Sequence, residues 1–359
     1  MLIVHRAERA DPLVDALASI LAVPADDPFS PDIVSVPSRG IERWLTQRLS
    51  NVLGTSGAGR GDGICANLEF PFPGRLVGRA LQAVTGIDPD EDPWVPARAV
   101  WPLMSVVDDH LGEDWLTTLA KHLGAPGDDA RQARRFSTAR HVADLFDRYS
   151  VHRPELITRW ARGDDVDGAG DALGPDVVWQ AMLWRSLRDR IGIPSPAERL
   201  GPAIDRLRES PDLVDLPDRV ALFGLTRLAP SMLQALDGIA AGRDVHLFLL
   251  HPSPALWQRV ASRPDATADA ESPLLRSWGK DAREMQLAIA ASIGPHEDVH
   301  HRRDLTADTL LHRLQSDVHG DVRPPAGGRP GGRTSPWTSD WRRCSRVSAV
   351  RSRRWCTSS

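Results

Sequence analysis

The sequence predicts an α/β protein in which a parallel-sheet domain is interrupted by a mainly helical domain. Two observations carry this prediction. Apolar runs and helix-type periodicity alternate as strand, helix, strand, helix over the first 52 residues. A second strand–helix–strand pattern follows at residues 219–252, after a long stretch with helical periodicity only. Such alternation is typical of parallel sheets, and an interruption by helices indicates an inserted domain.

The first four elements can be placed from apolar spacing and capping residues. Residues 2–5 and 33–36 are short apolar runs and predict buried strands. Asp11, followed by Pro12, and Ser38 are suitable N-caps for the two helices that follow. The expected apolar helix faces are Leu13, Leu17, Ile20 and Leu21 in the first helix, and Ile41, Trp44, Leu45, Leu49 and Val52 in the second.

The rest of the chain is divided by composition. Residues 54–63 are rich in glycine and predict a loop, and Pro71 and Pro73 should hold the next segment extended. Helical periodicity covers about residues 76–213, and strand, helix, strand then occupy 219–225, 231–241 and 244–252. We therefore expect an α/β domain formed by 1–75 and 215–318, a helical insertion at 76–214, and a disordered tail at 319–359.

Composition limits the class of protein. The net charge is −4, no apolar run reaches 18 residues, and the N-terminus lacks the pattern of a secretory signal. The three cysteines, Cys65, Cys344 and Cys356, have no metal-ligand spacing and suit a reducing compartment. We expect a cytoplasmic protein without a membrane segment. Basic charge is concentrated in the tail, where nine arginines face two aspartates from Asp321 onward.

Familiar catalytic motifs are absent from the sequence. Ser38 follows a strand and precedes Gly40, but Val36 stands where a nucleophile elbow requires glycine, so a helix cap is favoured over a nucleophile. No phosphate loop with its lysine and no G-x-G-x-x-G is present. His296 and His300 have the spacing of metal ligands on a helix, but Pro295 and the local charge favour a solvated loop or helix end. We expect no catalytic and no metal-binding residue.

The helix after Ser38 has one further interpretation. Free N–H groups at a helix start, together with Arg39 and Arg43, form a reasonable phosphate site. A solvated arginine face explains the same residues equally well. The residues alone leave both interpretations open.

Several blocks, in order, resemble the RecC family, the gamma subunit of exodeoxyribonuclease V. They are MLIVHRAERADPLVDAL, DDPFSPDIVSVPSRGIERWLTQRLS with ICANLEFPFP, ADLFDRYSVHRPELITRW, WQAMLWRSL, RVALFGLTRLAPSMLQAL with DVHLFLLHPSPALW, PLLRSWGKDAREM and LLHRLQSDV. The resemblance covers about residues 1–318. It implies a fold like that of superfamily 1 helicases without ATP-binding motifs. It also implies a non-catalytic subunit that splits duplex ends, guides single strands and inspects one of them for the Chi sequence.

The resemblance further implies partners, cofactors and a binding site. The partners would be a RecB-like beta subunit, a RecD-like alpha subunit, and single-stranded and duplex-end DNA. ATP and Mg²⁺ would be used by the partner subunits, with no cofactor in this chain. The implied DNA-binding residues are Pro37, Ser38, Arg39, Arg43, Phe72, Asp144, Leu145, Asp147 and Arg153.

The match at these positions is uneven. Pro37, Arg39 and Arg43 replace the family's Gln, Thr and Gln, and Gly78 stands where the family has Trp. Arginines more often contact phosphates or guanine than other base edges. These replacements put recognition of the familiar Chi sequence in question, but they do not weaken the expectation that the chain binds single strands.

The expected role is a DNA-guiding component of an ATP-dependent helicase–nuclease in double-strand-break repair by homologous recombination. The chain alone should neither hydrolyse ATP nor cut DNA. It would be part of an enzyme only as a component of the assembled complex. Family chains are much longer, and the tail after residue 318 resembles none of their blocks, so a frameshift is expected there. The alternatives are a truncated, non-functional product and, less favoured, an autonomous nucleotide-dependent enzyme.

Overall fold

A computed structural model describes residues 1–24, 27, 29–54, 63–124, 129–262, 269–302 and 309–323. The chain divides into two compact units. The sheet unit contains residues 2–71, 219–228 and the described residues from 245 onward. The helical unit contains residues 72–218 and 229–244, together with Met1. The predicted domain boundaries at residues 75, 214 and 318 stay predictions.

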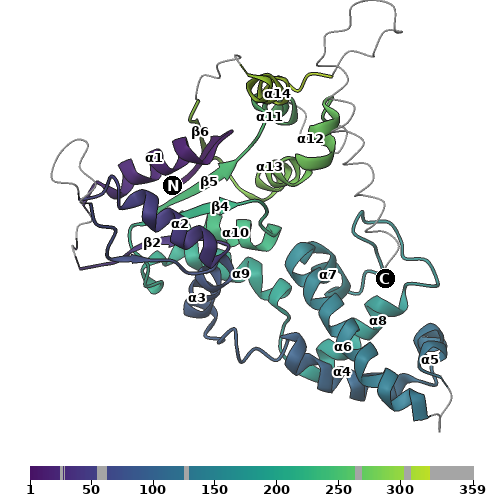
Figure 1. Cartoon of the computed structure of the whole chain (residues 1–359). Coiled ribbons are helices and arrows are strands. Elements are labelled where there is room, and N and C mark those ends of the chain that lie inside the picture. Colours follow the sequence, from purple (N-terminus) through teal and green to yellow (C-terminus); the bar gives the residue numbers. More distant parts are fainter. Residues whose placement is uncertain are drawn as a thin grey trace, which may run out of the picture. The chain divides into compact units, whose positions relative to one another are not determined.

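A six-stranded parallel sheet forms the centre of the sheet unit, as the α/β prediction requires (Figure 1). Its strands are β1 (Leu2–Ala7), β2 (Asp32–Ser35), β3 (Leu68–Glu69), β4 (Arg219–Leu225), β5 (Asp244–Leu250) and β6 (Glu297–His300). The order across the sheet is β3-β2-β4-β5-β1-β6. Strands from both ends of the described chain therefore lie side by side, with β1 between β5 and β6.

Continuous apolar runs explain why β1, β2, β4 and β5 are strands. Val4 on β1 and Leu247 on β5 are paired in register and fully buried, as expected for strands covered on both faces. One polar contact fixes the pairing of β2 with β4. The Arg219 guanidinium donates to both carboxylate oxygens of Asp32, at 2.7 and 3.1 Å. Such a bidentate pair gives geometric specificity to the register.

The described helices of the sheet unit are α1 (Ala10–Leu21), α2 (Arg39–Leu49), α11 (Pro254–Ser262), α12 (Pro273–Trp278), α13 (Lys280–Ser292) and α14 (Leu310–His319). Helices α1 and α2 lie together beside the sheet, and α11 to α14 gather near β5 and β6 (Figure 1). Leu13, Leu17, Leu45 and Leu49 are fully buried in one cluster with Phe248 of the sheet. The predicted apolar faces of the first two helices thus supply this core.

The helical unit contains α3 (Pro73–Thr85), α4 (Pro96–His110), a 3₁₀ turn (Asp114–Leu116), α5 (Thr117–Leu123), α6 (Asp129–His152), α7 (Pro154–Ala161), α8 (Trp179–Ile191), α9 (Pro196–Glu209), a second 3₁₀ turn (Pro211–Leu213) and α10 (Pro230–Ile239). Its core is built around tryptophan. Trp94 stacks on Trp184 at 5.7 Å between ring centroids, and Tyr149 meets Trp160 edge-on at 5.8 Å. The helical pattern of residues 76–213 is confirmed.

Four local predictions are wrong. Arg9, and not Asp11, is the N-cap residue of α1, and Asp11 lies in its first turn. Pro73 begins α3, because proline at the first helical position needs no N–H partner. Helix α2 ends at Leu49, so Val52 lies beyond it and is half exposed. Residues 297–300 form β6, and not a loop or helix end, because their backbone pairs with β1.

Two predictions concern residues that lie outside the description. Most of the predicted loop at residues 54–63 and most of the tail after residue 318, with Cys344 and Cys356, belong to this group. Among the helices that the structure describes, none is both long and apolar enough to span a membrane.

Candidate nucleic-acid interface

Ser38 is the residue at which β2 gives way to α2. Its backbone is extended, with φ −158° and ψ 154°, and its Oγ accepts a hydrogen bond from the Ile41 N–H at 3.3 Å. The prediction of a helix cap is therefore confirmed. Within the described chain, no hydrogen bond joins Ser38 to a histidine or a carboxylate, so no nucleophile arrangement surrounds the hydroxyl.

Arg39 and Arg43 lie one turn apart at the start of α2, beside Pro37, and all three are exposed. Neither arginine forms an ion pair with any residue that the structure describes. Arg48, near the end of the same helix, differs because it pairs with Asp11 at 3.7 Å and lies 5.7 Å from the Trp44 ring. Two uncommitted guanidinium groups and the first N–H groups of a helix are suited to bind an anion.

The end of β4 packs against the start of α2. Gly224 has φ +72°, and a Cβ there would lie 3.3 Å from Ile41 Cδ1, so glycine allows α2 to approach the strand. Three residues later, Arg227 pairs with Glu284 at 2.6 Å and with Asp281 at 4.0 Å. The carboxyl ends of parallel strands are where α/β sheets bind ligands. Arg39 and Arg43 occupy that edge after β2.

A second group of predicted residues lies on α6 in the helical unit. Asp144 is half exposed and accepts from Arg140 Nε at 3.3 Å. Asp147 lies one turn apart from Asp144. Burial raises the pKa of the Asp147 carboxyl, and the negative charge of Asp144 raises it further. Leu145, between them in sequence, is partly buried. Arg140 pairs with Asp144, and Arg148 and His152 act on Asp147, so this surface of α6 carries charges of both signs.

Arg153 follows α6 and precedes Pro154, the first residue of α7. Its backbone N–H donates to the Tyr149 carbonyl at 2.8 Å, and its side chain is exposed. A Cβ built on Gly168 would lie 3.0 Å from Arg153 Nη1, so the guanidinium rests against the 163–171 loop. One side of the guanidinium is therefore in contact with this loop, and the rest of Arg153 is exposed to solvent.

Phe72 is the N-cap residue of α3, and 48% of its surface is exposed. Its carbonyl accepts from the N–H groups of Arg75 and Leu76 at 2.9 and 3.0 Å. The backbone of Phe72 therefore starts the helix, whereas its ring is free to contact a ligand.

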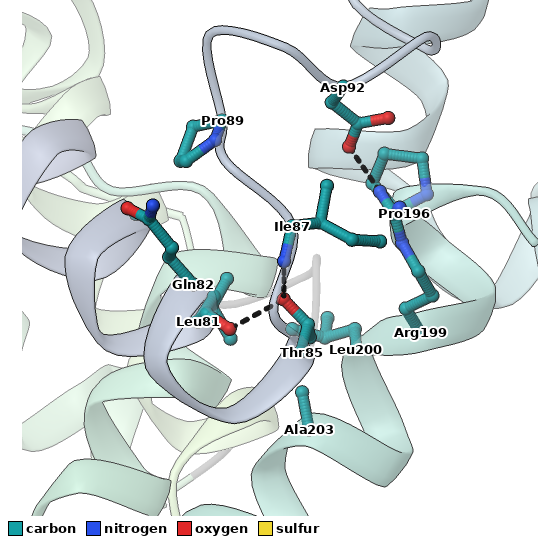
Figure 2. A pocket seen from close by; sticks show the side chains of 11 residues that line it. Leu81, Gln82, Thr85, Ile87, Pro89, Asp92, Pro196, Arg199, Leu200 and Ala203 are labelled. Atoms are coloured by element: carbon teal, nitrogen blue, oxygen red, sulfur yellow. Dashed lines mark hydrogen bonds and ion pairs between the residues drawn. The ribbon is translucent and has the colours of Figure 1, made fainter. Parts of the chain in front are cut away.

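A pocket of about 150 Å³ lies between the second half of α3, the following loop and the start of α9 (Figure 2). Gly78, Leu81, Ile87, Leu200 and Ala203 are among the residues that line it. At one end Asp92 forms an ion pair with Arg199. The charge of Asp92 also reaches Asp147 and helps to raise the pKa of that carboxyl, so this end of the pocket lies near α6.

Sequence reasoning missed the Asp92–Arg199 pair. The two residues are 107 positions apart, and Asp92 belongs to an acidic loop that resembled ordinary solvated surface. Gly78 was the one residue of the pocket that the sequence signalled. Its place next to Pro89, 3.3 Å from where a Cβ would be, leaves little space for a larger side chain without movement of the loop.

The predicted residues therefore form two groups and one separate residue. Pro37, Ser38, Arg39 and Arg43 lie together in the sheet unit. Asp144, Leu145, Asp147 and Arg153 lie on and directly after α6 in the helical unit. Phe72 starts a different helix of that unit. Their role in DNA binding stays a prediction.

No group of three or more possible metal ligands occurs among the residues that the structure describes. His300, which the sequence paired with His296, instead contacts Glu8 with 2.6 Å between Nε2 and Oε1. Lys280, the lysine after Gly279, begins α13 and lies 3.6 Å from the Glu284 carboxylate. Neither feature provides a phosphate or metal site.

Fold and site together define a parallel α/β protein with an inserted helical unit and a basic helix start at the carboxyl edge of its sheet. A family model described as RecC, N-terminal domain, matches residues 2–321. The chain belongs to this family.

Known relatives agree with this assignment. The RecBCD enzyme subunit RecC of Mycobacterium tuberculosis is 43% identical over 339 residues, which are 90% of this chain and 30% of the relative. The protein of the same name from Mycolicibacterium smegmatis is 41% identical over 335 residues, 90% of this chain and 28% of the relative. The RecC subunit of Escherichia coli is 28% identical over 362 residues, which are 89% of this chain and 30% of the relative. The chain thus spans less than a third of the length of these relatives.

Proposed function

We propose that this chain is a non-catalytic, DNA-guiding part of a RecBCD-type helicase–nuclease that acts in double-strand-break repair by homologous recombination. Membership of the RecC family supports the DNA-repair context. The observation that carries the DNA-binding role is the start of α2, where Arg39 and Arg43 are exposed and without an ion pair in the described chain. In this role they contact the backbone of a single strand.

The architecture supports a helicase-like origin without nucleotide binding. A phosphate loop joins a strand to a helix through glycines and a lysine. Here β1 passes into α1 through Glu8 and Arg9. Glu8 is engaged by His300, and Asp11 follows in the first turn of the helix. This turn has neither the glycines nor the lysine that hold phosphate, so ATP and Mg²⁺ are assigned to partner subunits.

The charges on the two groups indicate different tasks. Arginines hold phosphates or guanine, whereas carboxylates such as Asp144 and Asp147 accept hydrogen bonds from base amino groups. The carboxylates of α6 accordingly inspect bases, and the start of α2 holds the backbone. The partners proposed for this task are RecB-like and RecD-like subunits, with duplex ends and single strands as the DNA.

A double substitution tests the backbone contact. Arg39→Ala with Arg43→Ala should weaken binding of the full chain to a fluorescent oligothymidylate. It should also lower the slope of log K against log salt by about 1.4, because each phosphate contact on a single strand contributes about 0.7. Fluorescence anisotropy across a salt series measures both quantities.

Arg48→Ala is the matched control on the same helix, since Arg48 already pairs with Asp11. It should leave the slope unchanged. An unaltered slope in the double variant would rule out Arg39 and Arg43 as phosphate contacts. Failure of the unsubstituted chain to bind single strands would contradict the proposed function itself.

A further inference from the structure

Two aromatic side chains form an exposed pair on the helical unit. Trp101 of α4 is 63% exposed and Phe136 of α6 is 43% exposed. Their ring centroids are 5.7 Å apart, with the planes tilted by 45°. The two rings shield each other only in part. Most of Trp101 faces solvent, which is unusual for so large an aromatic side chain.

Arginines flank the pair on one side. Arg98 lies one turn before Trp101 on α4, and Arg140 lies one turn after Phe136 on α6. The two helices run antiparallel. Asp92, just before α4, acts on Asp147 late in α6, whereas Asp108 late in α4 forms an ion pair with Arg135 early in α6. The two arginines are therefore displaced from the aromatic pair in the same direction.

Near the pair, the carboxylates are in ion pairs, whereas one arginine is not. Arg98 is exposed and forms no ion pair with any described residue. The nearby carboxylates of Asp108 and Asp144 already pair with Arg135 and Arg140. The surface next to the two rings therefore favours an anionic ligand over a cationic or purely apolar one.

The pair also continues the surface of α6 for which DNA binding is proposed above. Phe136, Arg140 and Asp144 are spaced by four residues and share one face of α6. At 1.5 Å per residue, Phe136 and Asp144 are about 12 Å apart along the helix axis. That distance is on the scale of about two nucleotides of an extended strand, for which a planar ring with a cation beside it is a suitable support.

We propose that Trp101, braced by Phe136, is a stacking platform for a base of single-stranded nucleic acid, with Arg98 beside the flanking phosphate. This inference rests on the proposed function and adds a contact outside the residues assigned to it above. Aromatic stacking tolerates any base, so the platform contributes affinity and not sequence preference.

Trp101→Ala in the full chain tests the platform by anisotropy with a labelled oligothymidylate. The affinity should fall about 5- to 150-fold, because a stacked base contributes about 1–3 kcal/mol. Trp101→Phe should retain most of the affinity. Trp278→Ala, which removes another exposed tryptophan, 77% exposed and in the sheet unit, is the matched control and should bind like the unsubstituted chain.

A strand with abasic sites separates stacking from indirect effects. It should bind the unsubstituted chain and Trp101→Ala equally well, because there is no base to stack. Equal affinity of both proteins for the normal strand would overturn the platform while leaving the proposed function intact. An equal loss on both strands would overturn it too. Absence of any binding by the unsubstituted chain would overturn both proposals.

Discussion

At the scale of single residues, histidines inside the sheet unit are held uncharged by their surroundings. His251 follows β5, is 4% exposed and meets the Trp257 ring edge-on at 5.0 Å between centroids. Burial lowers its pKa to about 4, and the positive charge of Arg6 acts in the same direction. Asp298 opposes the shift and His300 adds to it. His5 of β1 is lowered to about 4 as well, mainly by burial.

These shifts make stability depend on pH. In the unfolded chain histidine has a pKa near 6.5, so between about pH 6.5 and 4 the unfolded state binds more protons than the folded state. Stability is therefore complete above pH 6.5 and decreases as the pH falls to about 4. For His251 the loss amounts to at most about 3 kcal/mol.

His251→Phe should flatten part of this decrease. Phenylalanine keeps the ring against Trp257 and cannot take up a proton, and His5 remains to cause the rest of the slope. Urea unfolding at a series of pH values between 4 and 7 measures the difference. His296→Phe, at an exposed position, is the control and should follow the unsubstituted chain. Identical pH profiles for His251→Phe and the unsubstituted chain would show that His251 does not titrate in this way.

At the scale of elements, the contact between β4 and α2 decides where the candidate phosphate site lies. Gly224 adopts a left-handed backbone inside a strand, with Ile41 of α2 directly above it. An L-residue at such a φ costs about 1–2 kcal/mol, and a Cβ would add a close contact. The helix start, with Arg39 and Arg43, is thus positioned by one glycine of a strand far away in sequence.

Two glycine substitutions should have opposite signs. Gly224→Ala should destabilise the chain by about 1–3 kcal/mol through strain and the 3.3 Å approach to Ile41 Cδ1. Gly40→Ala, in the first turn of α2 with its nearest neighbour at 3.7 Å, should stabilise it by about 0.5–1 kcal/mol. Urea unfolding measures both. Adding Ile41→Val to Gly224→Ala should recover part of the loss, and no recovery would exclude the contact as a cause.

Elements were predictable from sequence where one local signal dominated. Buried apolar runs identified β1, β2, β4 and β5, and Ser38 identified the start of α2. Pro73 misled, because proline suits both an extended segment and the first turn of a helix. The strand β6 was missed because none of its four residues is buried, so its charged sequence carries no strand pattern. Only its pairing with β1, distant in sequence, makes it a strand.

At the scale of the whole molecule, the candidate site depends on contacts that no sequence window contains. Asp92, before α4, pairs with Arg199 of α9, and Arg219 of β4 pairs with Asp32 of β2. Spacing alone could suggest Arg39 and Arg43, because both lie on one helix next to a recognisable cap. It could not suggest the pocket beside Gly78, which requires α3 and α9 to pack together.

The same long-range order leads to a prediction about nucleotides. β1 occupies an interior position in the sheet and leads into a helix, the arrangement that a phosphate loop would need. Its turn holds Glu8 and Arg9 where a phosphate loop has glycines and a lysine. The Glu8 side chain is buried against His300, and Asp11 pairs with Arg9. We therefore expect the purified chain to release no phosphate from ATP above the buffer background, with or without DNA ends.

A phosphate-release assay on gel-filtration fractions tests this expectation, because activity from a contaminating ATPase would not follow the chain across the peak. The decisive comparison uses Lys280→Ala, which removes the one lysine that follows a glycine at the start of a described helix. Saturable ATP hydrolysis that co-elutes with the chain and disappears in Lys280→Ala would show an autonomous nucleotide site. We expect only background activity in both proteins, because Glu8, in contact with His300, occupies the turn after β1.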